Sequence, residues 1–136
     1  MNRIGPTTHA LLRIFAGLLF ICPGGVKLFG WFGGMPAGMK LTPLLWVAAI
    51  IELVGGVMIV FGLFTRAVAF IASGEMAAAY FIGHFPKGFS PIQNHGEAAY
   101  LLCLIFLFLW GNGPGAWSLD GMRGKPGRMG VVTGDR

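Results

Sequence analysis

Residues 44–85 read LLWVAAIIELVGGVMIVFGLF followed by TRAVAFIASGEMAAAYFIGHF, and this stretch decides the fold. It contains two apolar runs, 44–64 and 66–85, and about 20 apolar residues are enough for an α-helix to cross a bilayer. A very short turn joins the two runs, so we predict that they are antiparallel neighbouring spans. Thr42 and Pro43 are expected to cap and start the first run, and Thr65 is expected to cap the second.

Two further apolar runs flank this pair. The first, 10–29, follows Pro6-Thr7-Thr8, which can start a helix by capping. The last, 94–111, is near the minimum length for a span, and Asn94 with Glu97 has the spacing of a capping box. We therefore predict an all-α fold, an integral membrane four-helix bundle with antiparallel up-down topology.

The composition supports a membrane protein. The chain has 136 residues, of which 55% are hydrophobic and 11% are charged, whereas a soluble domain carries about a quarter charged residues. This low charge argues against disorder and against nucleic acid as a partner, and the lipid bilayer is the expected surrounding. Residues 1–120 are predicted to be the four-helix transmembrane domain, and residues 121–136 a basic, Gly-rich cytoplasmic tail.

The basic residues predict the orientation of the chain. With four spans, both termini and the turn at Arg66 lie on one side, and that side also collects the bases of the tail. Lys40 and Lys87 fall in loops on the opposite, outer side. Because basic loops stay in the cytoplasm, we predict that the N and C termini are cytoplasmic.

The acidic residues are placed differently, because three of the five lie in or against apolar segments. Glu52 and Glu75 each share a helix face with small residues, which lets membrane helices approach closely, so both are expected to face the bundle interior. The predicted intramembrane polar cluster consists of Arg13, Lys27, Glu52, Glu75 and Glu97. Intramembrane carboxylates often mark proton or ligand pathways, and the alternative is that these groups form ion pairs that fix helix register.

The outer loop between the last two spans is the second candidate region. Its polar side chains are His84, Lys87, Asn94 and His95, and a polar cluster that caps the bundle is favoured here over a metal site. Trp31 and Phe85 are candidate walls of a pocket for a quinone head, although such aromatics also anchor span ends. Cys22 and Cys103 form no C-x-x-C motif and are interpreted as small buried hydrophobic residues, with any other role left open.

The chain resembles the DoxX family of small four-helix membrane proteins, over about residues 9–120. The matching motifs are LLR (11–13), KLFGWFGG (27–34), IELVGG (51–56), GLFTR (62–66), GEM (74–76), HFPKGF (84–89), NHGE (94–97) and GPGAWSLD (113–120). Many family members carry a histidine shortly before the lysine that matches Lys27. Here that stretch is CPGGV (22–26), so a mechanism that needs this histidine is in doubt for this chain.

The resemblance implies a multi-pass protein of the bacterial inner (plasma) membrane. It also implies a link to thiosulfate:quinone oxidoreductases and to redox-stress complexes, which favours an accessory subunit of a membrane-bound redox assembly. The alternative is an oxidoreductase subunit that binds quinone and moves protons through its intramembrane Glu and Lys residues. A small-solute or ion carrier is a third hypothesis, and the four spans leave little room for alternating access. The expected partners are other membrane subunits or further copies of the chain, and whether it is an enzyme stays open.

Overall fold

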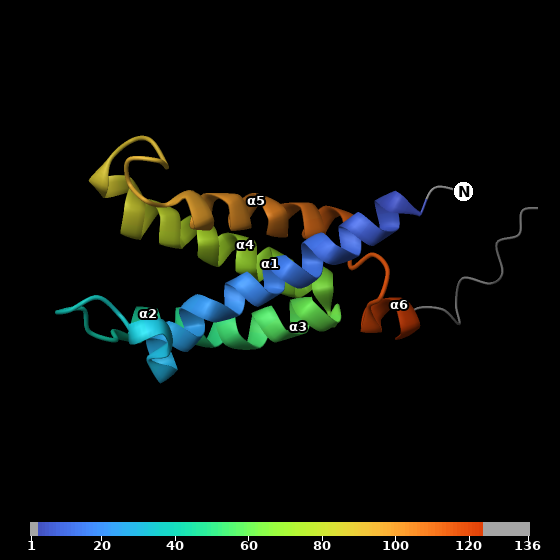
Figure 1. Ribbon diagram of the computed structural model, residues 1–136, viewed down its shortest axis with the longest axis horizontal. Helices are drawn as coiled ribbons and strands as arrows, with labels where there is room; N and C mark the ends of the chain where they lie inside the picture. The colour runs from blue at the N-terminus through green and yellow to red at the C-terminus, as the bar shows by residue number, and fades with distance from the viewer. Residues whose placement is uncertain (1–2, 124–136) are drawn as a thin grey trace, which may run out of the picture.

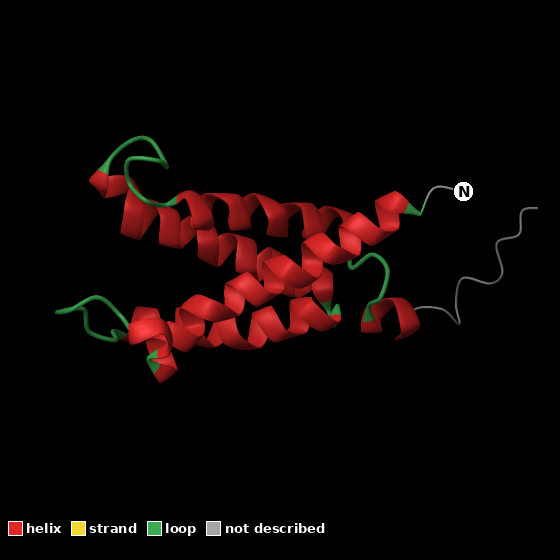
Figure 2. Ribbon diagram, in the orientation of Figure 1, coloured by secondary structure: helices red, strands yellow, loops and turns green. Residues whose placement is uncertain are grey.

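The computed structural model describes residues 3–123, and this part of the chain is helical, without β-strands (Figures 1 and 2). Two continuous helical rods, Pro43–Phe61 and Thr65–Lys87, are each built from consecutive helical segments, one of which is π-helical. The elements in chain order are α1 (Ile4–Phe29), η1 (Trp31–Gly33), α2 (Pro43–Ile50), η2 (Ile51–Gly55), α3 (Gly56–Phe61), α4 (Thr65–Ala79), η3 (Tyr80–His84), η4 (Phe85–Lys87), α5 (Glu97–Asn112) and α6 (Leu119–Arg123). The π-helical stretches are η2 and η3.

Three helical rods of the described chain are long and apolar enough to cross a membrane. They are α1, the rod from Pro43 to Phe61 and the rod from Thr65 to Lys87. The fourth apolar helix, α5, has 16 residues and is shorter than a typical span. The all-α class and three of the four expected helices are thus confirmed, whereas the span predicted over 94–111 stays a prediction.

The helices form two groups that meet at one end and separate at the other (Figure 1). In one group α4 lies beside α5, and in the other α1 lies beside α2 and α3. The start of α1 and the short α6 lie at the end where the groups meet, which we call the terminal end. The loops 30–42 and 88–96 lie at the opposite end, the loop end. Which end faces the cytoplasm remains a prediction, and residues 124–136 of the expected tail lie outside the described residues.

Glycines bring α1 into close contact with the second rod. A Cβ on Gly56 would lie 2.5 Å from Ile21 Cγ1 and 3.0 Å from the carbonyl oxygen of Gly17. Nearer the loop end of the same interface, a Cβ on Gly24 would lie 2.9 Å from the carbonyl oxygen of Ala49. The small residues therefore allow the backbones to touch, as expected from the sequence.

The core between the two groups is apolar and closely packed. Phe20 of α1 and Phe106 of α5 are fully buried and meet edge to face, with ring centroids 4.7 Å apart. The α4–α5 pair adds a polar tie, because the Ser73 hydroxyl donates to the Cys103 carbonyl at 2.8 Å. Cys22 and Cys103 are both free thiols and half-buried.

One predicted helix start is confirmed and three are wrong. The Thr42 side chain accepts a hydrogen bond from the Leu45 amide, with Pro43 at the first helical position. In contrast, α1 begins at Ile4, ahead of Pro6-Thr7-Thr8, and the Thr8 hydroxyl donates backward to the Ile4 carbonyl. The starts of α4 and α5 also differ from the prediction.

The start of α4 is capped by a residue distant in sequence. Asp120 accepts hydrogen bonds from the amides of Phe64 and Thr65, both at 2.8 Å. Phe64 adopts the left-handed conformation with φ of 49°, and the Thr65 hydroxyl has no hydrogen-bond partner among the described residues. Thr65 is therefore not the cap that the sequence suggested.

The start of α5 lacks the predicted capping box. Gly96 is the N-cap residue and Glu97 opens the helix, three residues later than expected. Asn94 lies before the helix, and its side-chain oxygen accepts from the Gly96 amide at 2.8 Å. Its amide group donates to Tyr80 and Gly88 instead, because the side chain is buried in the loop.

Candidate functional site

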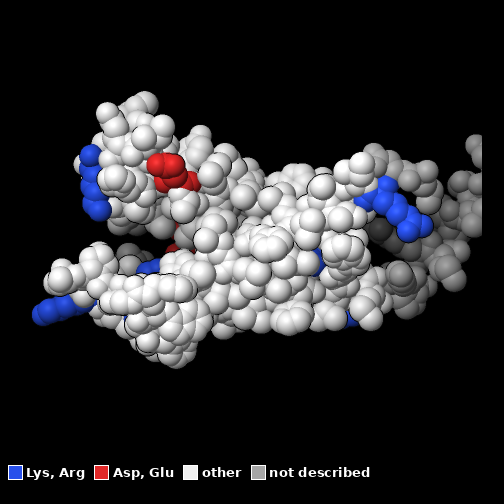
Figure 3. Space-filling view, viewed as in Figure 1, with Lys and Arg blue, Asp and Glu red and all other residues white. Residues whose placement is uncertain are grey.

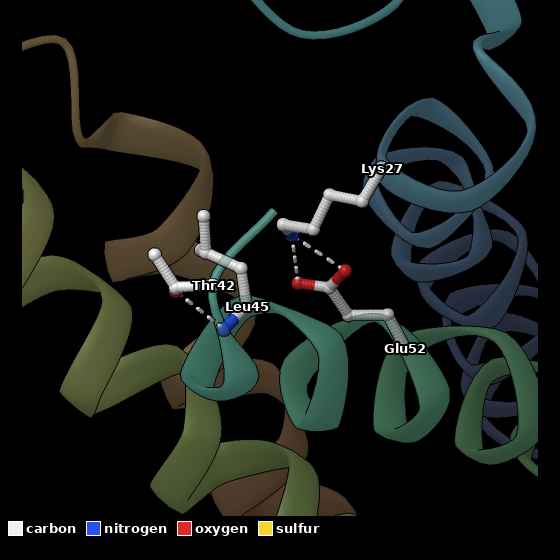
Figure 4. Close-up of polar contacts among 4 residues, drawn as sticks. All are labelled: Lys27, Thr42, Leu45 and Glu52. Carbon is white, nitrogen blue, oxygen red and sulfur yellow. Dashed lines mark hydrogen bonds and ion pairs between the residues drawn. The ribbon is translucent and has the colours of Figure 1, made fainter. Parts of the chain in front are cut away.

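The centre of the site is an ion pair between α1 and the second rod (Figure 4). Lys27 Nζ lies 2.7 Å from both carboxylate oxygens of Glu52. The Glu52 residue is 1% exposed, so its charge is almost entirely removed from solvent. The glycine contact at Gly24 positions the pair, because a Cβ there would lie 3.1 Å from Glu52 Cβ.

A second carboxyl group, Glu75 of α4, belongs to the same cluster. Glu75 and Glu52 interact electrostatically, and Lys27 attracts both carboxyl groups. One Glu75 oxygen, Oε2, is buried and has no hydrogen-bond partner among the described residues. Burial of an unpartnered polar atom costs free energy, so this oxygen would be stabilised by a hydrogen bond from another polar group.

These three side chains line a cavity of about 420 Å³ between the two helix groups. Apart from Lys27, Glu52, Glu75 and His84, its walls are aliphatic or glycine. The other lining residues are Leu44, Leu45, Val47, Ala48, Ile51, Ile71, Ala78, Ala79, Ile82 and Gly83. Figure 3 shows the loop end of the molecule divided by a notch, with acidic and basic atoms in its depth.

Both π-helical segments contribute to the cavity. Glu52 lies in η2, and His84 is the last residue of η3. A π turn inserts an extra residue into the helical repeat, so it rotates the following side chains relative to the preceding helix. Two such turns on opposite walls of one cavity are typical of functional sites.

The segment 85–96, which joins the rod ending at Lys87 to α5, is ordered by Asn94. The buried Asn94 side chain donates to the Tyr80 hydroxyl at 3.2 Å and to the Gly88 carbonyl at 3.0 Å. His84 Nδ1 lies 3.2 Å from the Asn94 carbonyl oxygen. Lys87 and His95 are exposed, so of the four residues singled out in this region only His84 reaches the cavity.

Two members of the predicted polar cluster lie elsewhere. Glu97 is exposed at the start of α5, outside the cavity. Arg13 is fully buried, but its guanidinium donates to backbone carbonyls at the terminal end. Its acceptors are the carbonyls of Ile59, Val60, Pro114, Ala116 and Trp117. Arg13 thus binds the carbonyls at the C-terminal end of α3 and anchors the loop 113–118. Because these carbonyls satisfy the guanidinium, it can be buried without an ion pair to Glu52.

The predicted aromatic walls are also absent from the cavity lining. Trp31 packs on α1, where its ring occupies the space that a Cβ on Gly25 would need. Phe85 of η4 contacts the rings of Tyr80 and Phe89. Neither residue lines the cavity, whose walls are aliphatic.

The role of Asp120 as the cap of α4 could not be predicted from the sequence, because a cap supplied from 55 positions away leaves no local pattern. A metal site has no support in the described residues, where no group of three His, Cys, Asp or Glu side chains could hold an ion.

Comparison with known proteins identifies the relatives of the chain. The family model described as DoxX matches residues 8–85. An "Uncharacterized protein" of Haemophilus influenzae (strain ATCC 51907 / DSM 11121 / KW20 / Rd) is 42% identical over 125 residues, covering 88% of this chain and 93% of the relative. "Putative oxidoreductase CatD" of Bacillus subtilis (strain 168) is 33% identical, covering 98% of this chain and 99% of the relative.

A further relative, "Inner membrane protein YqjF" of Escherichia coli (strain K12), is 30% identical and covers 92% of this chain and 98% of the relative. No solved structure matches the chain significantly.

Proposed function

The chain belongs to the DoxX family of membrane proteins, and from this premise we propose that it is a quinone-binding subunit of a membrane-bound redox assembly. One observation carries the proposal. The buried and unpartnered Oε2 of Glu75 lies on the wall of an apolar cavity beside the Lys27–Glu52 ion pair. A ligand that brings a hydrogen-bonding group to this oxygen would satisfy it.

The dimensions and lining of the cavity suit a quinone. Small-molecule sites are concave, mostly apolar and about 300–1,000 Å³ in volume, with a few polar groups that fix orientation. At about 420 Å³ the cavity falls in this range, and its polar groups are confined to four side chains. A flat ring with polar oxygens at its edges and an apolar tail matches that division into polar and aliphatic walls.

Each charged residue has a separate role in this proposal. Lys27 donates a hydrogen bond to a quinone oxygen, and Glu52 keeps Lys27 in place through the paired contacts at 2.7 Å. Glu75 holds a proton at its carboxyl group and exchanges it with the ligand. A bound quinone supplies the redox chemistry, because it accepts two electrons and two protons, and the electrons come from a cofactor of a partner subunit.

The setting of the chain follows from the same proposal. We infer an inner-membrane location, α5 as the fourth span and both termini in the cytoplasm, supported by the bases that collect at the terminal end. The name of the Bacillus subtilis relative, an oxidoreductase, supports the redox assignment. A partner subunit is required because the proposal assigns proton transfer, not electron transfer, to this chain.

Ligand binding tests the proposal directly. The purified chain in lipid nanodiscs is titrated calorimetrically with decyl-ubiquinone and with a short-tailed menaquinone. We expect one saturable site for at least one of the two quinones. Glu75→Leu should weaken that binding about 2- to 10-fold, because one hydrogen bond between neutral groups, of about 0.5–1.5 kcal/mol, is lost.

Glu97→Leu is the matched control, because Glu97 is exposed and outside the cavity, and it should bind like the unchanged chain. In membranes that contain the native assembly, Glu75→Gln should slow quinone reduction. The absence of saturable binding of either quinone, or an equal loss in both leucine variants, would contradict the proposal and favour an accessory subunit without a ligand.

A further inference from the structure

The cavity has a second polar position, which the proposed function does not use. His84 lines the cavity at the end of η3, nine residues after Glu75 on the same rod. Both side chains line the one cavity, so a ring with two opposite oxygens can form a hydrogen bond with one of them at each oxygen.

The hydrogen bonds around His84 fix which of its nitrogens carries a proton. Nδ1 lies 3.2 Å from the Asn94 carbonyl oxygen, and a carbonyl can only accept. Nδ1 is therefore the protonated nitrogen of the neutral ring. Asn94 cannot easily move away, because its own side chain is fully buried and bonded to Tyr80, Gly88 and Gly96.

This arrangement leaves Nε2 as the nitrogen available to a ligand. In the neutral ring Nε2 accepts a hydrogen bond, and in the protonated ring it donates one. The carbonyl oxygen of a quinone can only accept, whereas the hydroxyl of a hydroquinone can also donate. Neutral His84 is therefore complementary to the hydroquinone, and protonated His84 to the quinone.

The charged groups around His84 are those of the cavity. Glu75 lies on the same rod, and Lys27 and Glu52 enter from α1 and η2. From the loop packed against it, His84 meets the Asn94 carbonyl. Its side chain is half-buried, between the cavity and the surface.

We propose that His84 recognises the redox state of the quinone, by accepting a hydrogen bond from the hydroquinone hydroxyl through Nε2. This inference rests on the proposed function. In the quinone the same oxygen carries no hydrogen and can only accept, so the hydrogen bond to the neutral ring is lost.

The experiment measures binding of both redox forms of one ligand. Decyl-ubiquinone and decyl-ubiquinol are titrated anaerobically into the full chain in nanodiscs at pH 5 and pH 8. We expect the preference for the ubiquinol over the ubiquinone to rise about five- to tenfold from pH 5 to pH 8. His84→Phe should abolish this change, and His95→Phe, an exposed histidine of the same loop, should retain it.

A second measurement needs no ligand. Nitrogen NMR of the chain labelled with ¹⁵N-histidine reports the tautomer, and we expect the Nδ1–H form for His84, whose signals are absent from His84→Phe. The Nε2–H form, or an unchanged pH-dependent preference in His84→Phe, would overturn the role of His84 alone. Failure of the unchanged chain to bind either redox form would overturn the proposed function and this inference with it.

Discussion

We expect an added methyl group to change the stability of the chain differently at two helical glycines, Gly56 and Gly74. Gly56→Ala places a Cβ 2.5 Å from Ile21 Cγ1, 3.0 Å from the Gly17 carbonyl oxygen and 3.2 Å from the Ile21 amide nitrogen. Two of these three atoms belong to the backbone of α1, so rotation of a side chain cannot relieve the contact. The two helices must move apart, and overpacking of this kind costs about 1–3 kcal/mol.

Gly74→Ala is the matched control. Gly74 also lies within a helix, but a Cβ there would have no heavy atom within 4 Å. Both substitutions gain about 1 kcal/mol of helix propensity, so this gain cancels when the two variants are compared. We expect Gly56→Ala to be less stable than Gly74→Ala by about 1–3 kcal/mol.

The assay is unfolding of each variant in mixed micelles of a mild detergent and SDS, followed by circular dichroism. The free energies of unfolding of the two variants are compared with that of the unchanged chain. Equal changes in both variants would refute the reasoning, because the close approach of α1 to α3 would then not depend on Gly56.

Three further substitutions test individual contacts in the same unfolding assay. Lys27→Met leaves the buried Glu52 charge without its partner and should destabilise the chain by about 3–5 kcal/mol. The double variant Lys27→Met with Glu52→Met should recover most of this lost stability. A double variant as unstable as Lys27→Met alone would contradict the pairing. Asp120→Ala removes both acceptors of the α4 cap and should cost about 1–2 kcal/mol, and a cost near zero would mean that water replaces the cap. Thr65→Val removes a buried hydroxyl that has no partner among the described residues, so it should be neutral or slightly stabilising, and a loss above about 1 kcal/mol would reveal a missing partner.

Local patterns predicted the parts of the fold that local contacts determine. The Thr42-Pro43 start is correct because the cap and the amide it binds are three residues apart. The apolar run lengths identified the three long rods for the same reason, since length and hydropathy belong to each segment alone. The prediction failed where a distant residue competes, as at the α4 start, which Asp120 caps from another element.

The candidate site was predicted in part. Depth and helix face placed Lys27, Glu52 and Glu75 in one interior, and the structure lines one cavity with all three. Arg13 has the same apolar setting in the sequence, yet its charge is satisfied by carbonyl oxygens, which carry no signal in a pattern of side chains. His84, predicted only as part of the outer loop, ends a π-helical segment and lines the cavity, and a π turn leaves no clear pattern in the sequence.

The carbonyls around Arg13 have a consequence for the motion of the molecule. They come from two separate stretches, the end of α3 and the loop 113–118, so neither stretch can detach without stranding a buried guanidinium. The terminal end should therefore unfold only together with the whole bundle, and its amide hydrogens should exchange with solvent most slowly. Among the described residues, the ion pair of the loop end, Lys27–Glu52, joins two elements of the same helix group and does not cross the cavity. Movement at the loop end would leave the terminal end folded, so the proposed ligand could exchange there without unfolding the base of the bundle.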